Sequence, residues 1–310
     1  MSINYGPDGA ADGAARTVLG ALPSRDGPGR VMTAVDRVER ASALDSTAAR
    51  LRSWVKGMPL GRARDVLHGR WLGHPVHPML VQLPVGAWMS AAALDLLPGQ
   101  RRGAGALVGL GLTGAVPAAV AGWVDWAELR PGQQRVGLVH AASTAGAIWL
   151  YAGSLAARIA GRHGLGRVLG FAGLTLVSAG GALGGHLAYR QAVGANHAEG
   201  LAARIGSRWH DVGPLADFPV DEPVRCGVDG VPVVVVRRAD DRVYALVEQC
   251  SHLGGPLSQG HLTDGCLKCP WHGSLFRLSD GWNVHGPATA PQPAFETRVL
   301  DGSVRLRLRD

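Results

Sequence analysis

Two short stretches, Cys250-Ser-His252-Leu-Gly-Gly-Pro and Cys269-Pro-Trp-His272-Gly-Ser, decide the fold of the last third of this 310-residue chain. Each stretch pairs one cysteine with one histidine, and 16 residues separate His252 from Cys269. Two thiolates and two imidazoles in one small region form a ligand set for a metal. The glycines and prolines around both pairs predict loops. The sequence therefore predicts a metal site held between two loops.

Two kinds of metal group accept this ligand set. A mixed Cys/His [2Fe–2S] cluster has two thiolates on one iron and two imidazoles on the other, whereas a Cys2His2 zinc site gathers all four ligands around one ion. β-Branched runs at 231–238 and 243–247, and a hairpin pattern over 299–304, predict strands around the loops, where zinc fingers usually have a helix under the histidines. The cluster is the favoured interpretation, and zinc stays open as the alternative.

Residues 207–310 resemble the Rieske family in both ligand loops, in the approach around Trp209 and in the proline-rich stretch over 281–293. The resemblance implies an all-β domain in which the [2Fe–2S] ligands are Cys250, His252, Cys269 and His272. It also implies that the Ser274 hydroxyl donates to a cluster sulfide and that the proline-rich stretch screens the cluster from solvent.

The residues around the four predicted ligands differ from those of the high-potential members of that family. Those members carry a further cysteine in each loop, joined as a disulfide, and the matching positions here are Gly255 and Pro270. Phe276 replaces a tyrosine that donates to a ligand thiolate. Because hydrogen bonds to sulfur raise the reduction potential, we expect a ferredoxin-like cluster in the lower half of the range of about −150 to +300 mV.

Four stretches upstream are long, apolar and free of Asp, Glu, Lys and Arg: 71–94, 103–124, 136–157 and 168–189. About 20 such residues form a helix that crosses a membrane. Pro84 and Pro117 lie inside two of them, as is tolerated in a packed membrane bundle. A buried soluble bundle is the alternative, but its helices would show a polar face, which these stretches lack.

The predicted fold class is a multi-domain chain, an α-helical four-span transmembrane bundle followed by an all-β Rieske domain. We expect a polar region over 1–70, the transmembrane domain over 71–192, a linker over 193–206 and the Rieske domain over 207–310. In the polar region, the first 30 residues are predicted to be disordered, followed by one amphipathic helix over about 31–55. No signal-peptide pattern is visible at the N-terminus.

Arginines flank the predicted spans, and slightly more of them lie on the side of the two termini. This excess favours both termini, and with them the Rieske domain, on the cytoplasmic side. They also account for the pI near 9.8. Since no nucleic-acid-binding motif accompanies this charge, we expect no nucleic-acid partner.

A second group of ionisable residues lies at the ends of the predicted spans: His74, His77, Asp125, His140 and His186. In an up-and-down bundle all five share one membrane face, the face from which the Rieske domain hangs. Ionisable residues at such depth are a functional-site hypothesis. Haem b, with His77 and either His140 or His186 as axial ligands, another metal, a quinone or proton site, and structural roles all stay open.

Residues 71–195 are similar to DUF2231, a family of small four-helix membrane domains. The motifs that carry this resemblance are the His-Pro-x-His-Pro-Met-Leu stretch from His74, Gly122-Trp-Val-Asp125-Trp, the histidine at 140 and Gly185-His-Leu-Ala-Tyr-Arg. The resemblance implies a membrane location and no known activity.

The combination predicts a membrane-bound protein that passes single electrons between a soluble or quinol donor and a membrane-associated acceptor. Expected partners are membrane lipid and a redox protein or quinone. A redox sensor or scaffold, and the ferredoxin-like component of an oxygenase system, are the alternatives. We do not expect an oxygenase domain of its own, because the 2-His-1-carboxylate iron site needs a large domain and the chain ends at residue 310.

Overall fold

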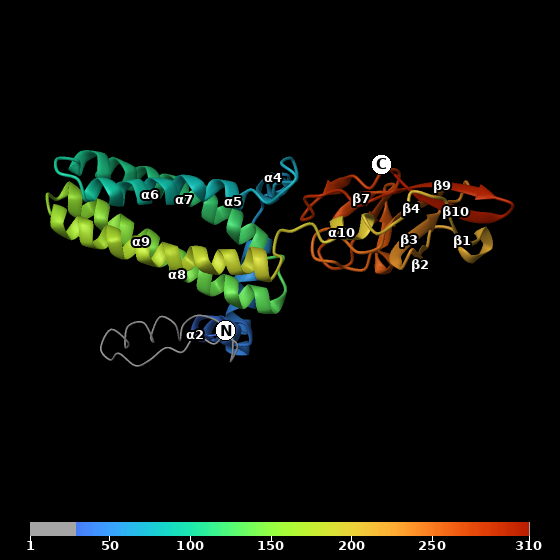
Figure 1. Cartoon of the computed structure of the whole chain (residues 1–310), viewed down its shortest axis with the longest axis horizontal. Helices are drawn as coiled ribbons and strands as arrows, with labels where there is room; N and C mark the ends of the chain where they lie inside the picture. Colours follow the sequence, from blue (N-terminus) through green and yellow to red (C-terminus); the bar gives the residue numbers. More distant parts are fainter. Residues whose placement is uncertain (1–28, 310) are drawn as a thin grey trace, which may run out of the picture.

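A computed structural model describes residues 29–309, so the disorder predicted for the first residues lies outside the described range. A helical domain comes first and a β domain follows at one end of it (Figure 1). The helices are α2 (Gly29–Glu39), α3 (Asp45–Gly57), α4 (Ala63–His68), α5 (His77–Leu80), α6 (Gln82–Asp95), α7 (Arg101–Trp126), α8 (Pro131–Ile159), α9 (His163–Gly185) and α10 (Glu199–Ala202). A π-helix, His186–Arg190, continues α9.

Helices α6 to α9 form a four-helix bundle whose core is built from aromatic rings set against glycines. Trp88 and Tyr151 stack with ring centroids 4.2 Å apart and lie 2% and 1% exposed. A Cβ atom on Gly111 would lie 2.2 Å from the Trp88 ring nitrogen, and one on Gly173 would lie 2.9 Å from the Tyr151 ring. The small residues therefore let the helices close around two large rings, as close helix packing requires.

The first predicted span is shorter and less regular than the sequence suggested. Residues 71–76 are outside the helices, and α5 and α6 are separate elements that meet at Val81. Pro84 has no N–H to donate to the preceding turn, which explains the break. Among residues 29–309, two helices qualify by length and apolar composition to cross a membrane, Arg101–Trp126 and His163–Arg190.

The end of the bundle far from the β domain is closed by a buried ion pair. The Arg158 guanidinium binds both carboxylate oxygens of Asp95, with Nη1 2.9 Å from Oδ1, and both side chains are 4% exposed. A bidentate pair satisfies both groups where water is excluded. These two residues come from the ends of α6 and α8, and sequence analysis did not predict their contact.

The single amphipathic helix expected over 31–55 is two helices, α2 and α3, joined by a short 3-10 turn at Ser42–Leu44. Helix α3 packs on the bundle: Val55 is fully buried in a cluster with Ala48 and Trp126. Arg135 of α8 holds the turn through two hydrogen bonds to the Asp45 carboxylate, at 2.7 and 2.8 Å.

The β domain contains three antiparallel sheets. Their strand orders are β1 (His210–Pro214)–β10 (Ser303–Leu308)–β9 (Phe295–Leu300), β2 (Pro223–Val228)–β3 (Val231–Arg237)–β4 (Val243–Val247), and β5 (His261–Thr263)–β6 (Cys266–Lys268)–β7 (Leu275–Arg277)–β8 (Asn283–His285).

Strand β3 separates the two hydrophobic cores of this domain. Val233 and Val235 face one core, whereas Val234 and Val236 face the other, which also contains Cys250 and Cys269. Successive side chains of a strand point to opposite faces, so a continuous valine run fills both cores. The second core anchors the two loops that carry the candidate ligands.

The predicted linker is packed against the β domain. Ile205 is 8% exposed and belongs to the first β-domain core. The His197 amide donates to the Ser251 carbonyl at 2.9 Å, and Gln249 donates back to the His197 carbonyl at 3.2 Å. The segment therefore holds the first ligand loop at a fixed place beside the end of α9.

Candidate functional site

The two ligand loops are closed in the same way. In the first, the Cys250 amide donates to the Gly255 carbonyl and the Gly254 amide donates to the Cys250 carbonyl, both at 2.9 Å. In the second, the Cys269 amide donates to the Ser274 carbonyl at 2.9 Å, and the Gly273 amide donates to the Cys269 carbonyl at 3.1 Å. Gly254 and Gly273 adopt positive φ angles of 75° and 78°, which favour glycine. Each loop thus presents its cysteine and histidine from a tight turn.

The four ligands face one another as two pairs. The Nδ1 atoms of His252 and His272 lie 3.2 Å apart, with the rings nearly perpendicular at 89°. A tetrahedral metal with bonds of about 2.0–2.1 Å holds two imidazole nitrogens at roughly this spacing. The Cys250 and Cys269 thiols are 1% and 2% exposed and form their own hydrogen-bonded pair. Two imidazoles for one iron and two thiolates for the other fit a [2Fe–2S] cluster.

The hydrogen bond with Cys269 and burial raise the pKa of Cys250 well above its ordinary value, whereas the pKa values of the other three groups are lowered. Burial lowers the pKa of His252 well below its ordinary value and also lowers the pKa of His272, so both rings are neutral. The hydrogen bond from the Cys250 thiol lowers the pKa of Cys269 to about 7. Within residues 29–309, no three His, Cys, Asp or Glu side chains converge closely enough to hold one ion. The pairwise arrangement therefore disfavours the single zinc ion.

The surroundings of the cluster site are tightly packed. A Cβ on Gly255 would lie 3.0 Å from the Cys269 sulfur, so a cysteine could not be accommodated there without movement. The Ser274 oxygen accepts a hydrogen bond from the Ala288 amide at 3.0 Å, which leaves its hydrogen free to donate. Phe276 is fully buried in β7. The roles that the sequence predicted for Gly255, Ser274 and Phe276 beside the cluster stay a prediction.

Gln292 is a supporting residue that the sequence did not single out. It is 1% exposed, accepts from the Ser251 amide at 3.0 Å and donates to the carbonyls of Val247 and Gln249 at 2.6 and 2.7 Å. It therefore ties the proline-rich stretch to the first ligand loop. Glutamine in a proline-rich run gives no pattern from which this role could have been predicted.

Comparison with known proteins agrees with both parts of the chain. Residues 208–296 match the model of the Rieske [2Fe-2S] domain. Over 102 residues the chain is 33% identical to the anthranilate 1,2-dioxygenase ferredoxin subunit of Burkholderia cepacia, a match that spans 33% of this chain and 94% of that relative. The chain belongs to the Rieske [2Fe–2S] family. It is an electron-transfer Rieske protein, and the four ligand positions fit the cluster that this domain holds.

Further matches cover the same domain and the bundle. The 3-phenylpropionate/cinnamic acid dioxygenase ferredoxin subunit of Escherichia coli strain K12 is 32% identical over 96 residues, or 31% of this chain and 89% of that relative. The ferredoxin of carbazole 1,9a-dioxygenase from Nocardioides aromaticivorans IC177 is 28% identical in a solved structure, covering 33% of this chain and all of that one, with a TM-score of 0.32. Residues 73–197 match the model described as predicted membrane protein (DUF2231).

The Rieske domain is docked on the end of the bundle with its ligand loops inward. Arg130, at the start of α8, donates to the Leu253 carbonyl in the first loop at 2.5 Å, and its guanidinium lies 5.8 Å from the centre of the Trp271 ring in the second. One cation from the bundle therefore contacts both ligand loops. Sequence analysis counted Arg130 only among the arginines that flank the predicted spans.

A second contact fixes the proline-rich stretch. The Asp65 carboxylate, in α4, accepts from the Gly286 amide at 3.0 Å and lies 3.0 Å from Nδ1 of His285. Arg70 donates to the Asn283 carbonyl at 3.2 Å. Helix α4 thus holds the edge of the Rieske domain beside the cluster site.

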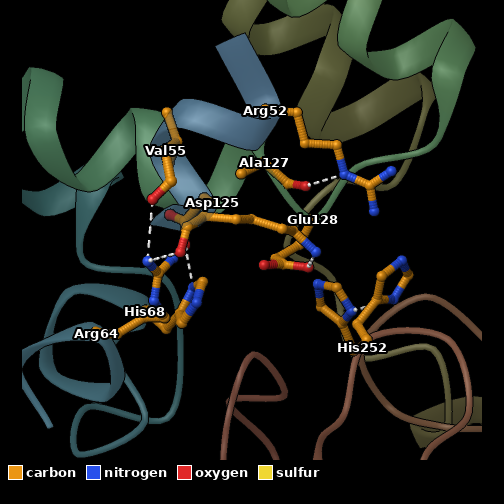
Figure 2. A network of polar contacts seen from close by, with 10 residues as sticks. Arg52, Val55, Arg64, His68, Asp125, Ala127, Glu128 and His252 are labelled. Carbon is orange, nitrogen blue, oxygen red and sulfur yellow. Dashed lines mark hydrogen bonds and ion pairs between the residues drawn. The ribbon is translucent and has the colours of Figure 1, made fainter. Parts of the chain in front are cut away.

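A cavity of about 250 Å³ lies between the bundle and the Rieske domain. Its ionisable lining residues are His68, His77, Asp125, His140 and the cluster ligand His252. Figure 2 shows His68 in contact with Asp125 on the bundle side, and it shows His252 on the ligand loop of the Rieske domain. The His68 ring nitrogen Nδ1 lies 2.8 Å from Asp125 Oδ1. The cavity therefore joins the cluster site directly to the polar end of the bundle.

The structure brings together three of the five predicted membrane-face residues. His77, His140 and Asp125 line the cavity, with the His77 and His140 ring centroids 6.2 Å apart. His74 is exposed, and its Nδ1 lies 3.0 Å from the carbonyl of Pro75. His186 does not line the cavity. His68, which sequence analysis missed because it precedes the predicted spans, takes a place beside Asp125.

Proposed function

We propose that this chain is a membrane-bound Rieske protein that passes single electrons between a soluble or quinol donor and a membrane-associated acceptor. The [2Fe–2S] cluster supplies one-electron chemistry when bound. The observation that carries the proposal is the position of His252, a cluster ligand that lines the same cavity as His77 and His140 of the bundle. Electrons that leave the cluster through this ring reach the bundle without crossing bulk solvent.

The bundle is proposed to span the membrane four times. Helices α6 and α8 pack against α7 and α9, which are the two that qualify as spans. All four helices would therefore lie at the same depth in the membrane. The outer surface of the bundle carries exposed apolar side chains: Leu83, Met89, Leu110, Val116, Trp149, Val168 and Phe171. An apolar exterior around a small-residue interior is expected of a lipid-facing bundle. On this proposal the arginine balance puts the Rieske domain on the cytoplasmic side.

A soluble donor is supported by the relatives, which are described as ferredoxin subunits of dioxygenases. The chain spans nearly all of their length, so its Rieske domain has the parts of a free-standing ferredoxin. We propose a redox protein as the donor and an acceptor at the bundle. Arg130 supports electron transfer beside the ligand loops. A fixed cation there stabilises the reduced cluster, which carries one more negative charge than the oxidised cluster.

The test uses full-length protein in lipid nanodiscs. Two donors are offered separately, a flavoprotein ferredoxin reductase with NADH, and decylubiquinol. Reduction is followed by the visible circular dichroism and the EPR signal of the cluster. The proposal expects fast one-electron reduction by at least one donor and reoxidation by acceptors in the native membrane. A cluster that neither donor reduces, and whose redox state changes only the affinity for another protein, would support a sensor instead.

A further inference from the structure

On the bundle side, the cavity between the two domains is lined by two histidines, His77 and His140. We propose that it binds a b-type haem, with His77 of α5 and His140 of α8 as the two axial ligands. This inference deepens the proposed function, on which it rests for its purpose, by identifying the acceptor within the bundle. The haem would supply a one-electron carrier when bound.

Hydrogen bonds fix the tautomer of both rings. Nδ1 of His77 lies 2.8 Å from the carbonyl of Ala118, and Nδ1 of His140 lies 2.7 Å from the carbonyl of Gly180. A carbonyl oxygen only accepts, so each Nδ1 carries the proton and each Nε2 keeps its lone pair. A histidine that donates its other ring N–H to a backbone carbonyl is the arrangement found in metal-ligating histidines.

The spacing of the rings fits ligation from opposite sides of one metal. Their centroids are 6.2 Å apart. An iron held between the two Nε2 atoms by bonds of about 2 Å would need roughly this separation of the rings. The proposed cluster ligands His252 and His272, which would share one iron, have ring centroids that are closer, at 4.9 Å. A bare metal ion is disfavoured, because no third His, Cys, Asp or Glu among residues 29–309 converges with this pair.

Small residues line the cavity beside the two rings and let both rings lie close to the neighbouring helices. The cavity wall includes Ala119, Gly122, Ala141, Ala145 and Gly184. A Cβ on Gly122 would lie 2.9 Å from Nδ1 of His77, and one on Gly184 would lie 3.4 Å from the His140 ring. The cavity has a volume of about 250 Å³, and both rings lie in its wall. Four-helix bundles place cofactor sites in this way, between facing helices.

The experiment measures haem in the full-length protein, purified in detergent from cells supplied with 5-aminolevulinic acid. A pyridine haemochrome assay should find one haem b per chain, and the optical spectrum should be low-spin. His77→Ala and His140→Ala should each lose at least nine-tenths of this haem. The matched control is His74→Ala, from the same motif but exposed at the surface, which should keep all of it. The cluster EPR signal reports the integrity of each variant.

A rescue separates ligation from folding. His77→Gly should bind haem in the presence of imidazole and recover a low-spin spectrum, because the free ring replaces the missing ligand. Absence of haem from protein made in haem-replete cells, co-purification of a quinone in its place, or haem retained in both alanine variants would overturn the inference. If haem is absent but the cluster still exchanges electrons with the membrane, the inference fails and the proposed function stands.

Discussion

The molecule contains two facing pairs of histidines, one in the Rieske loops and one in the bundle, and they differ in which nitrogen is available. His252 and His272 turn their Nδ1 atoms toward each other at 3.2 Å, whereas His77 and His140 turn theirs to backbone carbonyls. The first pair can share an iron through Nδ1, and the second can ligate only through Nε2. Backbone hydrogen bonding, rather than residue type, therefore separates the two sites.

The two pairs also differ in how the chain holds them. The cluster pair comes from two turns within about 20 residues, each closed by its own backbone hydrogen bonds. The bundle pair comes from two helices and depends on helix packing for its spacing. The first site is set by local sequence, and the second is set by tertiary structure. Substitutions that act on one pair and spare the other test this difference.

The largest effect is expected from removing a thiolate. Cys250→Ala should abolish the cluster, because one iron loses half of its protein ligands, and labile sulfide should fall from two per chain to none. The bundle pair should be unaffected. Iron, sulfide and zinc analysis with EPR gives the result. Cys226→Ala is the control, since burial raises the pKa of the Cys226 thiol to about 11 and it lies outside the site. Zinc without labile sulfide in the wild type would contradict the cluster.

A smaller effect should follow from adding one methyl group beside each pair. Gly255→Ala places a Cβ 3.0 Å from the Cys269 sulfur, and Gly122→Ala places one 2.9 Å from the His77 ring. Overpacking of this kind costs about 1–3 kcal/mol of the free energy of unfolding. Gly255→Ala should speed cluster loss to a chelator, and Gly122→Ala should not. Equal rates of cluster loss in the two variants would show that the sites are not independent.

The cluster ligands could be proposed from local sequence, whereas the contacts of the bundle site depend on tertiary structure and could not. Cys250, His252, Cys269 and His272 lie in two short motifs with fixed spacing, and their loops carry the glycines that the turns need. The roles of His68, Arg130 and Asp65 could not be predicted, because each contacts residues far away in the chain. The motif that contains His74 and His77 did not show which ring faces inward, since helix packing decides it.

The smallest effect is expected from a single hydroxyl near the cluster. Phe276→Tyr should raise the midpoint potential by a few tens of millivolts, since hydrogen bonds to cluster sulfur stabilise the reduced state. A redox titration followed by EPR measures the shift, with Phe276→Leu as the control that adds no donor. A wild-type midpoint near the top of the range of about −150 to +300 mV would contradict the ferredoxin-like interpretation.

The Rieske domain docks on the end of the bundle that carries His77 and His140, and a disulfide tests this arrangement most directly. A Cβ on Gly286 lies 3.8 Å from the Cβ of His68, within the range of about 3.5–4.5 Å that disulfides require. The His68→Cys/Gly286→Cys protein, mildly oxidised in membranes and then cleaved at a protease site inserted between the two positions, should stay joined on a non-reducing gel. The control pairs His68→Cys with Gly227→Cys, where nothing lies within 4 Å. Near-complete linkage in the first protein alone is the predicted result, and linkage no greater than in the control would contradict the docked arrangement.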